Sequence, residues 1–156
     1  MKLIIIAALS RNRVIGKNGK VPWNIPEDMR RFKRLTLHHT VVMGRRSYET
    51  LEEPLVHRRN VVITSRHLPG VETYSSLDDA FRRLANEEIV WIIGGGEIFS
   101  HTIEIADEWK LTHVDRVLDG DTFFPPYEHL IGTKFRIVFE EKHEGFVYRD
   151  YVKIPF

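Results

Sequence analysis

Asp28 is the residue whose neighbours in the sequence indicate a chemical role most clearly. Pro26 suits the first turn of a helix, because proline lacks the N–H that this turn leaves unpaired. Helical spacing then places Asp28, Phe32 and Leu35 on one inward stripe, where a carboxyl among apolar groups has a raised pKa and can steer a proton near neutral pH. The alternative is an acid of the first turn that is favoured only by the helix dipole. The arginines of this segment are expected mostly on the other faces: Arg30, Arg31 and Arg34.

Two groups of residues suit the binding of phosphates. The glycines 94–96 follow a buried run and open a helix, where free N–H groups suit a pyrophosphate, although a tight strand-to-helix turn explains them equally well. Arg45 and Arg46 follow one predicted strand, and Ser65 and Arg66 follow the next. Such strand ends meet at the carboxyl edge of a sheet, where guanidinium groups beside hydroxyls suit a phosphate monoester. Taken singly, these arginines are better explained as part of a solvated surface.

A third basic pair follows a short acidic segment. Arg58 and Arg59 come after Glu52 and Glu53, so they either clamp a ligand carboxylate or pair with those glutamates. The eight histidines lack the His-x-x-x-His spacing of a metal-binding helix, and we predict no metal site. No serine has the G-x-S-x-G context of a hydrolase nucleophile.

Composition limits the partners and the organisation of the chain. Its 156 residues suit a single domain, residues 1–156. The net charge of +1, from 23 basic and 22 acidic residues, argues against nucleic acid or an anionic membrane as the main partner. The absence of cysteine excludes a disulfide framework and a thiolate metal site. The apolar run of residues 1–9 has no clear cleavage site and is too short to cross a bilayer, so we expect a buried strand in a cytoplasmic protein.

The elements that must position these residues are strands alternating with helices. Runs rich in Val and Ile predict strands at Leu3–Leu9, Thr40–Met43, Asn60–Ile63, Ile89–Ile93, Lys110–Val114, Phe135–Phe139 and Phe146–Ile154. Helices are predicted at Pro26–Leu35, Arg45–Leu51, Leu77–Leu84 and about Glu97–Ala106, the third with a capping pattern of Ser76 and Asp79. This alternation indicates an α/β fold with a largely parallel sheet. The last two runs lack a helix between them and predict an antiparallel hairpin.

The motifs, taken in order, resemble one enzyme family over nearly the whole chain. They are Ile6–Leu9, Val14–Gly16, Val21–Asp28, Phe32–Lys33, Met43–Arg45, Pro54–Leu55 with Arg58, Ile93–Gly96, Leu111–His113 and Gly120–Pro125. In order and spacing they are similar to dihydrofolate reductase of the bacterial type. The resemblance implies a single, mostly parallel central sheet of about eight strands with flanking helices and a C-terminal antiparallel hairpin.

The resemblance also implies an activity and a set of site residues. The family reduces dihydrofolate to tetrahydrofolate by hydride transfer from NADPH, which supplies one-carbon metabolism, and we expect a monomer. The catalytic group would be Asp28, which holds the pterin, with Trp23 and Thr112. The substrate residues would be Ile6, Ala8, Asp28, Met29, Phe32, Leu51, Leu55, Arg58, Ile93 and Thr112, with Arg58 on the glutamate carboxylate. The NADPH residues would be Ala8, Ile15, Gly44, Arg45, Arg46, Ser47, Thr64, Ser65, Arg66, Ile93, Gly95, Gly96, Glu97, Ile98, Phe99 and Thr122.

The family pattern brings further expectations about the backbone and the loops. Trp23 and the loop from Ile15 to Val21 would form a mobile lid, and the Gly95–Gly96 peptide bond is expected to be cis. Four positions depart from the commonest pattern. Val56-His57 replaces Pro-Gly before the folate-binding arginine, Val21 replaces a larger lid residue of some relatives, and Glu97 follows the glycines. The acid at 97 means that phosphates must rely on backbone N–H groups and the arginines.

Other functions have specific difficulties. A reductase of another pterin-like or pyrimidine substrate would keep the NADPH half and change the surroundings of Asp28. A nucleotide-binding or regulatory module needs neither that acid nor a carboxylate clamp at Arg58. A structural or interaction protein leaves both glycine turns unexplained.

Overall fold

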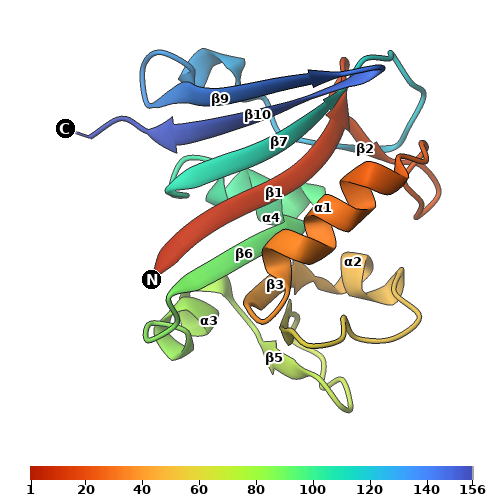
Figure 1. Ribbon diagram of the computed structural model, residues 1–156. Helices are drawn as coiled ribbons and strands as arrows, with labels where there is room; N and C mark the ends of the chain where they lie inside the picture. The colour runs from red at the N-terminus through yellow and green to blue at the C-terminus, as the bar shows by residue number, and fades with distance from the viewer. Residues whose placement is uncertain (156) are drawn as a thin grey trace.

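The computed structural model describes residues 1–155, and its centre is one large β-sheet (Figure 1). The strands are β1 (Lys2–Ser10), β2 (Val14–Gly16), β3 (Thr40–Gly44), β4 (Arg59–Ile63), β5 (Glu72–Tyr74), β6 (Ile89–Gly94), β7 (Glu108–Val114), β8 (Thr122–Phe123), β9 (Phe135–His143) and β10 (Phe146–Lys153). Eight of them form the central sheet, in the order β5-β4-β3-β6-β1-β7-β10-β9, and β2 pairs with β8 separately. Phe156, the last residue of the predicted domain, lies outside the described residues.

The direction of the strands confirms the predicted fold class. Every pairing from β5 to β7 is parallel, whereas β10 runs antiparallel to both β7 and β9. The C-terminal hairpin therefore forms as predicted, with its turn at residues 143–146. The sequence does not predict β5, because three residues at a sheet edge are too short to show a period.

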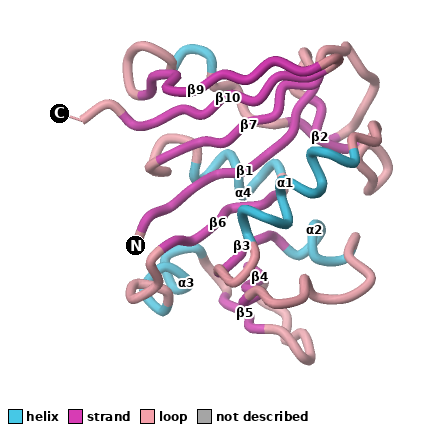
Figure 2. Tube along the Cα trace, in the orientation of Figure 1, coloured by secondary structure: helices cyan, strands magenta, loops and turns pink. Residues whose placement is uncertain are grey.

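Four α-helices cover the two faces of the sheet within residues 1–155 (Figure 2). They are α1 (Pro26–Thr36), α2 (Arg45–Glu49), α3 (Leu77–Arg83) and α4 (Gly96–Thr102), and a 3-10 turn spans Glu128–Leu130. Side chains of α1 and α2 pack on one face, and those of α3 and α4 pack on the other. None of the helices described here is long and apolar enough to cross a membrane.

Hydrogen bonds at the helix ends explain where the boundaries fall. Ser76 Oγ accepts the N–H of Asp79 at 3.1 Å, so α3 begins with the predicted cap. Helix α4 ends at Thr102, before the predicted end near Ala106, although Ile103 and Ala106 still donate to the carbonyls of Phe99 and Thr102 at 2.9 Å. Asp107 N–H donates to the carbonyl of Leu3 at 2.8 Å, and the indole of Trp109 donates to the carbonyl of Ile103 at 2.9 Å. Tertiary hydrogen bonds thus begin at Asp107, where the chain leaves this last turn and enters β7.

The parallel register brings the phosphate-type motifs to one edge of the sheet. Gly44 at the end of β3 pairs with Ile63 at the end of β4, and Met43 pairs with Gly94 at the end of β6. The segments that follow these three strands therefore start side by side. This edge is where ligands of open α/β sheets bind.

Candidate active site

Asp28 lies in the first turn of α1, which crosses the face of the sheet (Figure 1). Its Oδ1 accepts a hydrogen bond from Thr112 Oγ1 at 2.7 Å. Thr112 is buried in β7, directly beside Ala8 of the neighbouring strand β1. The acid therefore points inward, as helical spacing predicts, and it is fixed to a central strand.

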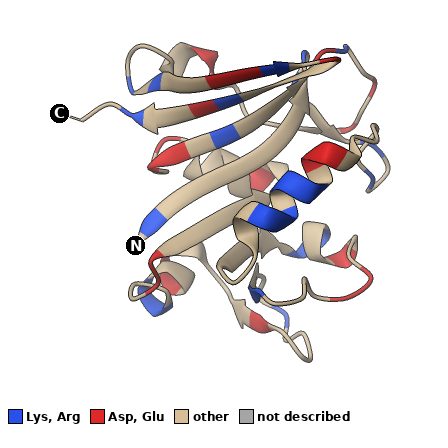
Figure 3. Cartoon of the chain, viewed as in Figure 1, with Lys and Arg blue, Asp and Glu red and all other residues tan. Residues whose placement is uncertain are grey.

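The surroundings of Asp28 favour its neutral form. Burial raises the pKa of the carboxyl above its ordinary value of 3.8, and the nearby Glu27 adds to this effect. The Thr112 hydrogen bond and the positive charge of Arg31 act in the opposite direction. Figure 3 shows the acidic residues at the N-terminal end of α1 and basic residues along the rest of the helix. Asp28 is thus an acid with a perturbed proton affinity at the edge of an apolar wall.

The apolar wall beside Asp28 contains most of the predicted pterin-side residues. Phe32, Leu51, Leu55 and Ile93 pack against the buried cluster that includes Ile6. The remaining members of this cluster on the sheet are Ile4, Val41, Met43, Val62 and Trp91. Met29 differs, because 67% of its surface is exposed and it lies on the outer side of α1.

Arg58 and Arg59, which the sequence does not distinguish, have different partners. Arg59 pairs with Glu72 at 2.7 Å and with Glu87 at 2.8 Å. Arg58 donates to the hydroxyl of Thr36 at 3.2 Å and to the carbonyl of Val56 at 3.0 Å. No carboxylate within residues 1–155 forms an ion pair with Arg58, so pairing with Glu52 or Glu53 is not observed. Arg58 also lines a cavity of about 600 Å³ at the amino ends of β3, β4 and β6, which shares no residue with the cavity beside Trp23.

The glycine turn corrects one prediction. The cis peptide bond joins Gly94 to Gly95, one residue earlier than the predicted Gly95–Gly96 bond. Gly96 is already the first residue of α4, and Gly94 has a φ of 139°, which only glycine adopts readily. A Cβ on Gly96 would lie 2.8 Å from the carbonyl oxygen of Phe123. The turn is therefore tight because β8 approaches it closely.

The predicted phosphate residues follow the ends of the strands beside this turn. A Cβ on Gly95 would lie 3.1 Å from Ser47 Oγ, which places the Ser47 hydroxyl against the glycine backbone. Arg66 follows β4, where its N–H donates to Thr64 Oγ1 at 3.1 Å. Arg45 pairs with Glu49 at 2.6 Å. The described residues offer no ion-pair partner to Arg46 or Arg66, which leaves these two guanidinium groups available to an anion. The other predicted cofactor residues lie on β2, β3, β8 and α4 or follow β4: Ile15, Gly44, Ser65, Glu97, Ile98, Phe99 and Thr122.

The predicted lid is tied to the segment of residues 119–122. Lys17 Nζ lies 2.9 Å from Asp119 Oδ2, and the N–H of Asn18 donates to Asp121 Oδ2 at 2.9 Å. A cavity of about 760 Å³ opens between this loop and the half-buried Trp23. Basic and amide side chains line it together with Val21, Pro22 and Trp23, and its lining contains no acid.

Arg31 is oriented differently from the prediction. Its guanidinium carbon lies 4.1 Å from the centre of the Tyr148 ring, and its Nη2 lies 3.4 Å from Asp150 Oδ1. Arg31 therefore faces the sheet and not the solvent. The sequence offers only a weak signal for this contact, because Asp150 comes 119 residues later and only the strand register brings it under the helix.

His113, which follows Thr112 on β7, has a burial that can be tested by pH. Its Nε2 lies 2.8 Å from the Tyr151 hydroxyl, and burial lowers the pKa of the ring to about 4 from its ordinary 6.5. Above pH 6.5 the His113 ring is neutral in both the folded and the unfolded chain. Between pH 6.5 and about 4 the ring gains a proton readily only in the unfolded chain. The contribution of His113 to stability is thus present above pH 6.5 and lost as the pH falls towards 4.

We expect the loss to reach about 3 kcal/mol at most, from roughly 1.36 kcal/mol per pKa unit. Urea unfolding of wild type and His113→Gln at neutral and at acid pH measures it. The free energy of unfolding should fall less on acidification in the variant. Exposed His129→Gln is the matched control and should behave as wild type. An equal acid loss in wild type and His113→Gln would contradict the assignment.

The comparisons with known proteins agree on one family. The model of the family described as dihydrofolate reductase matches residues 2–151. Dihydrofolate reductase type 3 of Salmonella typhimurium is 45% identical over 130 residues, which are 81% of this chain and 80% of the relative. Dihydrofolate reductase of Buchnera aphidicola subsp. Baizongia pistaciae is 33% identical over 145 residues, 91% of this chain and 87% of the relative. The structure of dihydrofolate reductase from Enterococcus faecalis, complexed with NADP(H) and RAB-propyl, has a TM-score of 0.87 at 29% identity and covers 97% of this chain and 96% of that one.

Proposed function

This chain belongs to the dihydrofolate reductase family, and we propose from this premise how its own residues divide the reaction. The enzyme reduces dihydrofolate to tetrahydrofolate, the carrier of one-carbon metabolism, and bound NADPH supplies the hydride. The observation that carries the assignment of residues is the half-buried carboxylate of Asp28, held by Thr112 over an apolar wall. An acid in such a place is costly unless a ligand uses it.

Asp28 would orient the substrate and set its proton affinity. Its carboxylate accepts hydrogen bonds from the pterin's amino group and ring nitrogen, with Thr112 fixing the other side of the acid. When the ring carbon gains a hydride, the adjacent ring nitrogen gains a proton and the C=N bond becomes CH–NH. A water delivers that proton, and the charge of Asp28 raises the basicity of the ring. Trp23 and the lid loop would close over the ring and exclude bulk water.

The rest of the substrate would extend from this acid along α1. Phe32, Leu51 and Leu55 would contact the pterin and the aminobenzoyl group, with Met29 on the rim. Arg58 would bind the glutamate carboxylate, because its guanidinium has no acidic partner within residues 1–155. The backbone carbonyls of Ile6 and Ile93 would lie near the pterin, as the resemblance implies.

The residues at the carboxyl edge of the sheet fit NADPH. The glycine turn lets a ligand approach the backbone, and the Ser47 hydroxyl lies against it. Arg46, Ser65 and Arg66 would hold the adenosine 2′-phosphate, while the half-buried Ala8 would face the nicotinamide together with Ile15 and Phe99. These residues would bind and orient the cofactor beside Asp28.

One assay tests the proposed function as a whole. We expect NADPH oxidation, followed by its absorbance, to require dihydrofolate. A reductase of a different pterin or a pyrimidine would oxidise NADPH only with its own substrate, and a binding module would not oxidise it at all. We also propose that residues 1–156 form one domain and that the protein is a cytoplasmic monomer, and sedimentation would test the monomeric state. The balanced charge supports the absence of a nucleic-acid partner.

Arg66→Ala tests the assignment of the 2′-phosphate site. Loss of one charge-assisted hydrogen bond costs about 1.5–3 kcal/mol, so NADPH should bind roughly tenfold or more weakly while NADH changes little. Titration of cofactor binding measures both constants. Arg45→Ala should have a smaller effect, because Arg45 is already paired with Glu49. Exposed Arg82→Ala on α3 is the matched control. Equal weakening of NADPH and NADH by Arg66→Ala would remove the assignment.

A further inference from the structure

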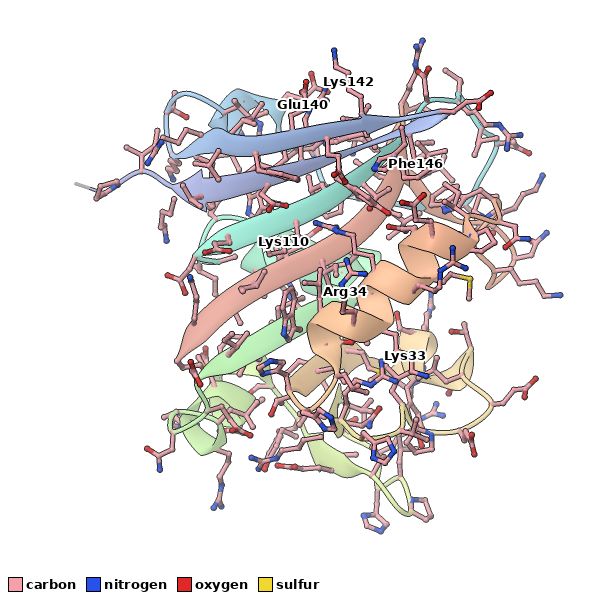
Figure 4. The ribbon with its side chains drawn as sticks, in the orientation of Figure 1. Lys33, Arg34, Lys110, Glu140, Lys142 and Phe146 are labelled. Atoms are coloured by element: carbon pink, nitrogen blue, oxygen red, sulfur yellow. The ribbon has the colours of Figure 1, made fainter. Side chains whose placement is uncertain are left out.

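Charged side chains form a cluster directly behind Asp28, between α1 and the sheet. The strand register pairs Lys110 with Asp150 and Thr112 with Tyr148 across β7 and β10. Because side chains alternate along a strand, these four residues share one face, and on this face Thr112 meets Asp28 of α1. Figure 4 shows Lys110 on β7 beside α1. The cluster therefore lies against the same helix that carries the acid.

Arg31 enters this cluster about one helical turn after Asp28. Its guanidinium stacks on the Tyr148 ring at 4.1 Å and pairs with Asp150 Oδ1 at 3.4 Å. Lys110 Nζ pairs with the other oxygen, Asp150 Oδ2, at 2.9 Å. The three charged side chains are mostly buried, with exposed fractions of 11% for Arg31, 16% for Asp150 and 20% for Lys110. Two cations share one carboxylate, so the cluster keeps one positive charge where solvent screens it little.

Arg31 is the cation of this cluster that lies on the same helix as Asp28. Burial alone would drive Asp28 towards its neutral form, and the charge of Arg31 opposes that effect. The Tyr148 hydroxyl has no hydrogen-bond partner within residues 1–155, so its ring serves Arg31 as a stacking surface. The other titratable groups that face Asp28 or its immediate neighbours come from α1, β7, β9 and β10: Glu27, Lys110, Glu141, His143, Tyr148 and Asp150.

We propose that Arg31 is a positioning residue for Asp28, because Asp150 and the Tyr148 ring hold its guanidinium so that it fixes α1 on the sheet and keeps a positive charge behind the carboxylate. The Asp28–Thr112 and Arg31–Asp150 contacts join α1 to two neighbouring strands about one turn apart. Rolling or sliding of α1 would break at least one of them. The inference rests on the proposed function only for its effect on catalysis, since the charge and the contacts exist without substrate.

Substitution of either partner of the Arg31–Asp150 pair is expected to shift the titration midpoint of Asp28, and the two shifts should have opposite signs. Arg31→Gln leaves Lys110 and Asp150 with no net charge, whereas Asp150→Asn leaves two cations. The titration midpoint of Asp28, measured by carboxyl carbon NMR and assigned with Asp28→Asn, should rise by about half to one pH unit in Arg31→Gln. It should fall by a similar amount in Asp150→Asn. A merely structural pair would loosen the helix equally from either side and move the midpoint in one direction.

Matched variants separate charge from packing. Arg30→Gln removes the same charge from the exposed face of α1 and should leave the midpoint of Asp28 where it is in wild type. Arg31→Lys restores the charge and should bring the midpoint most of the way back from that of Arg31→Gln. If Arg31→Gln fails to fold, Asp150→Asn still tests the proposal, because the midpoint of Asp28 should fall in that variant. Shifts in the same direction, or none in Asp150→Asn, would overturn the proposal.

The effect on catalysis has its own readout. The pH at which hydride transfer falls to half should move upward in Arg31→Gln and downward in Asp150→Asn, in step with the NMR midpoints. A wild-type enzyme without dihydrofolate-dependent NADPH oxidation would refute the proposed function, while the NMR titrations would still decide the role of Arg31. Opposite NMR shifts without any movement of the pH profile would confine that role to the free enzyme and overturn its part in catalysis.

Discussion

Asp28→Asn is expected to lower turnover of dihydrofolate by about two to four orders of magnitude at neutral pH, which is the range of general acid–base contributions. Asparagine keeps the size of the side chain and removes the charge that orients the pterin and raises its basicity. Stopped-flow measurement of hydride transfer, with NADPH bound before dihydrofolate is added, gives the loss directly. The fold and NADPH binding should survive, because the cofactor residues lie at the carboxyl edge of other strands.

The pH dependence of the same step distinguishes the role of Asp28 further. Since the reaction consumes a proton, wild-type hydride transfer should slow as the pH rises. Because burial raises the pKa of Asp28, this carboxyl should titrate above the ordinary range of an aspartate. Asp28→Asn should recover part of its rate in acid, where solution protonates the substrate.

Glu27→Gln is the matched control for Asp28→Asn. It removes one negative charge from the adjacent position, where the side chain is exposed and lies 3.7 Å from His143 Nδ1. We expect its turnover to stay close to that of wild type. If Asp28→Asn also turned over at a near-normal rate at neutral pH, Asp28 would be an acid of the first helical turn without a part in the chemistry.

Arg58→Ala is expected to raise the Michaelis constant for dihydrofolate by about tenfold to a hundredfold, since a charge-assisted bond to a carboxylate is worth roughly 1.5–3 kcal/mol. The hydride step should change less, because the glutamate tail is remote from the reacting bond. Steady-state and single-turnover kinetics separate the two effects. A substrate that lacks the glutamate tail should bind wild type and variant equally.

Arg59→Ala controls for the loss of a neighbouring cation. Its guanidinium is already bound to Glu72 and Glu87, so removal should lower thermal stability and leave the Michaelis constant nearly unchanged. If Arg58→Ala harmed the truncated substrate as much as the complete one, the contacts of Arg58 with Thr36 and Val56 would define a structural role instead.

Local patterns in the sequence were sufficient for the fold class. Apolar runs separated by helical segments predict a mostly parallel sheet, because strand and helix periods are set within a few residues. The cap at Ser76 and the hairpin turn at residues 143–145 are of the same local kind and are observed. The end of α4 at Thr102 was not predicted, because the chain continues with turn-type hydrogen bonds, such as Ala106 N–H to the carbonyl of Thr102, and a local pattern does not separate such a turn from a helix.

Some features of the candidate site likewise follow from the sequence, and others depend on the tertiary structure. The sequence by itself determined that Asp28 faces inward and that the glycine and arginine motifs follow strand ends, since helical spacing and strand order fix both. Only the tertiary structure decided which of Arg58 and Arg59 keeps a free charge, because their partners come from other loops and strands. It also placed Arg31 over Asp150, 119 residues away, through a register that packing across the sheet selects and that no local period encodes.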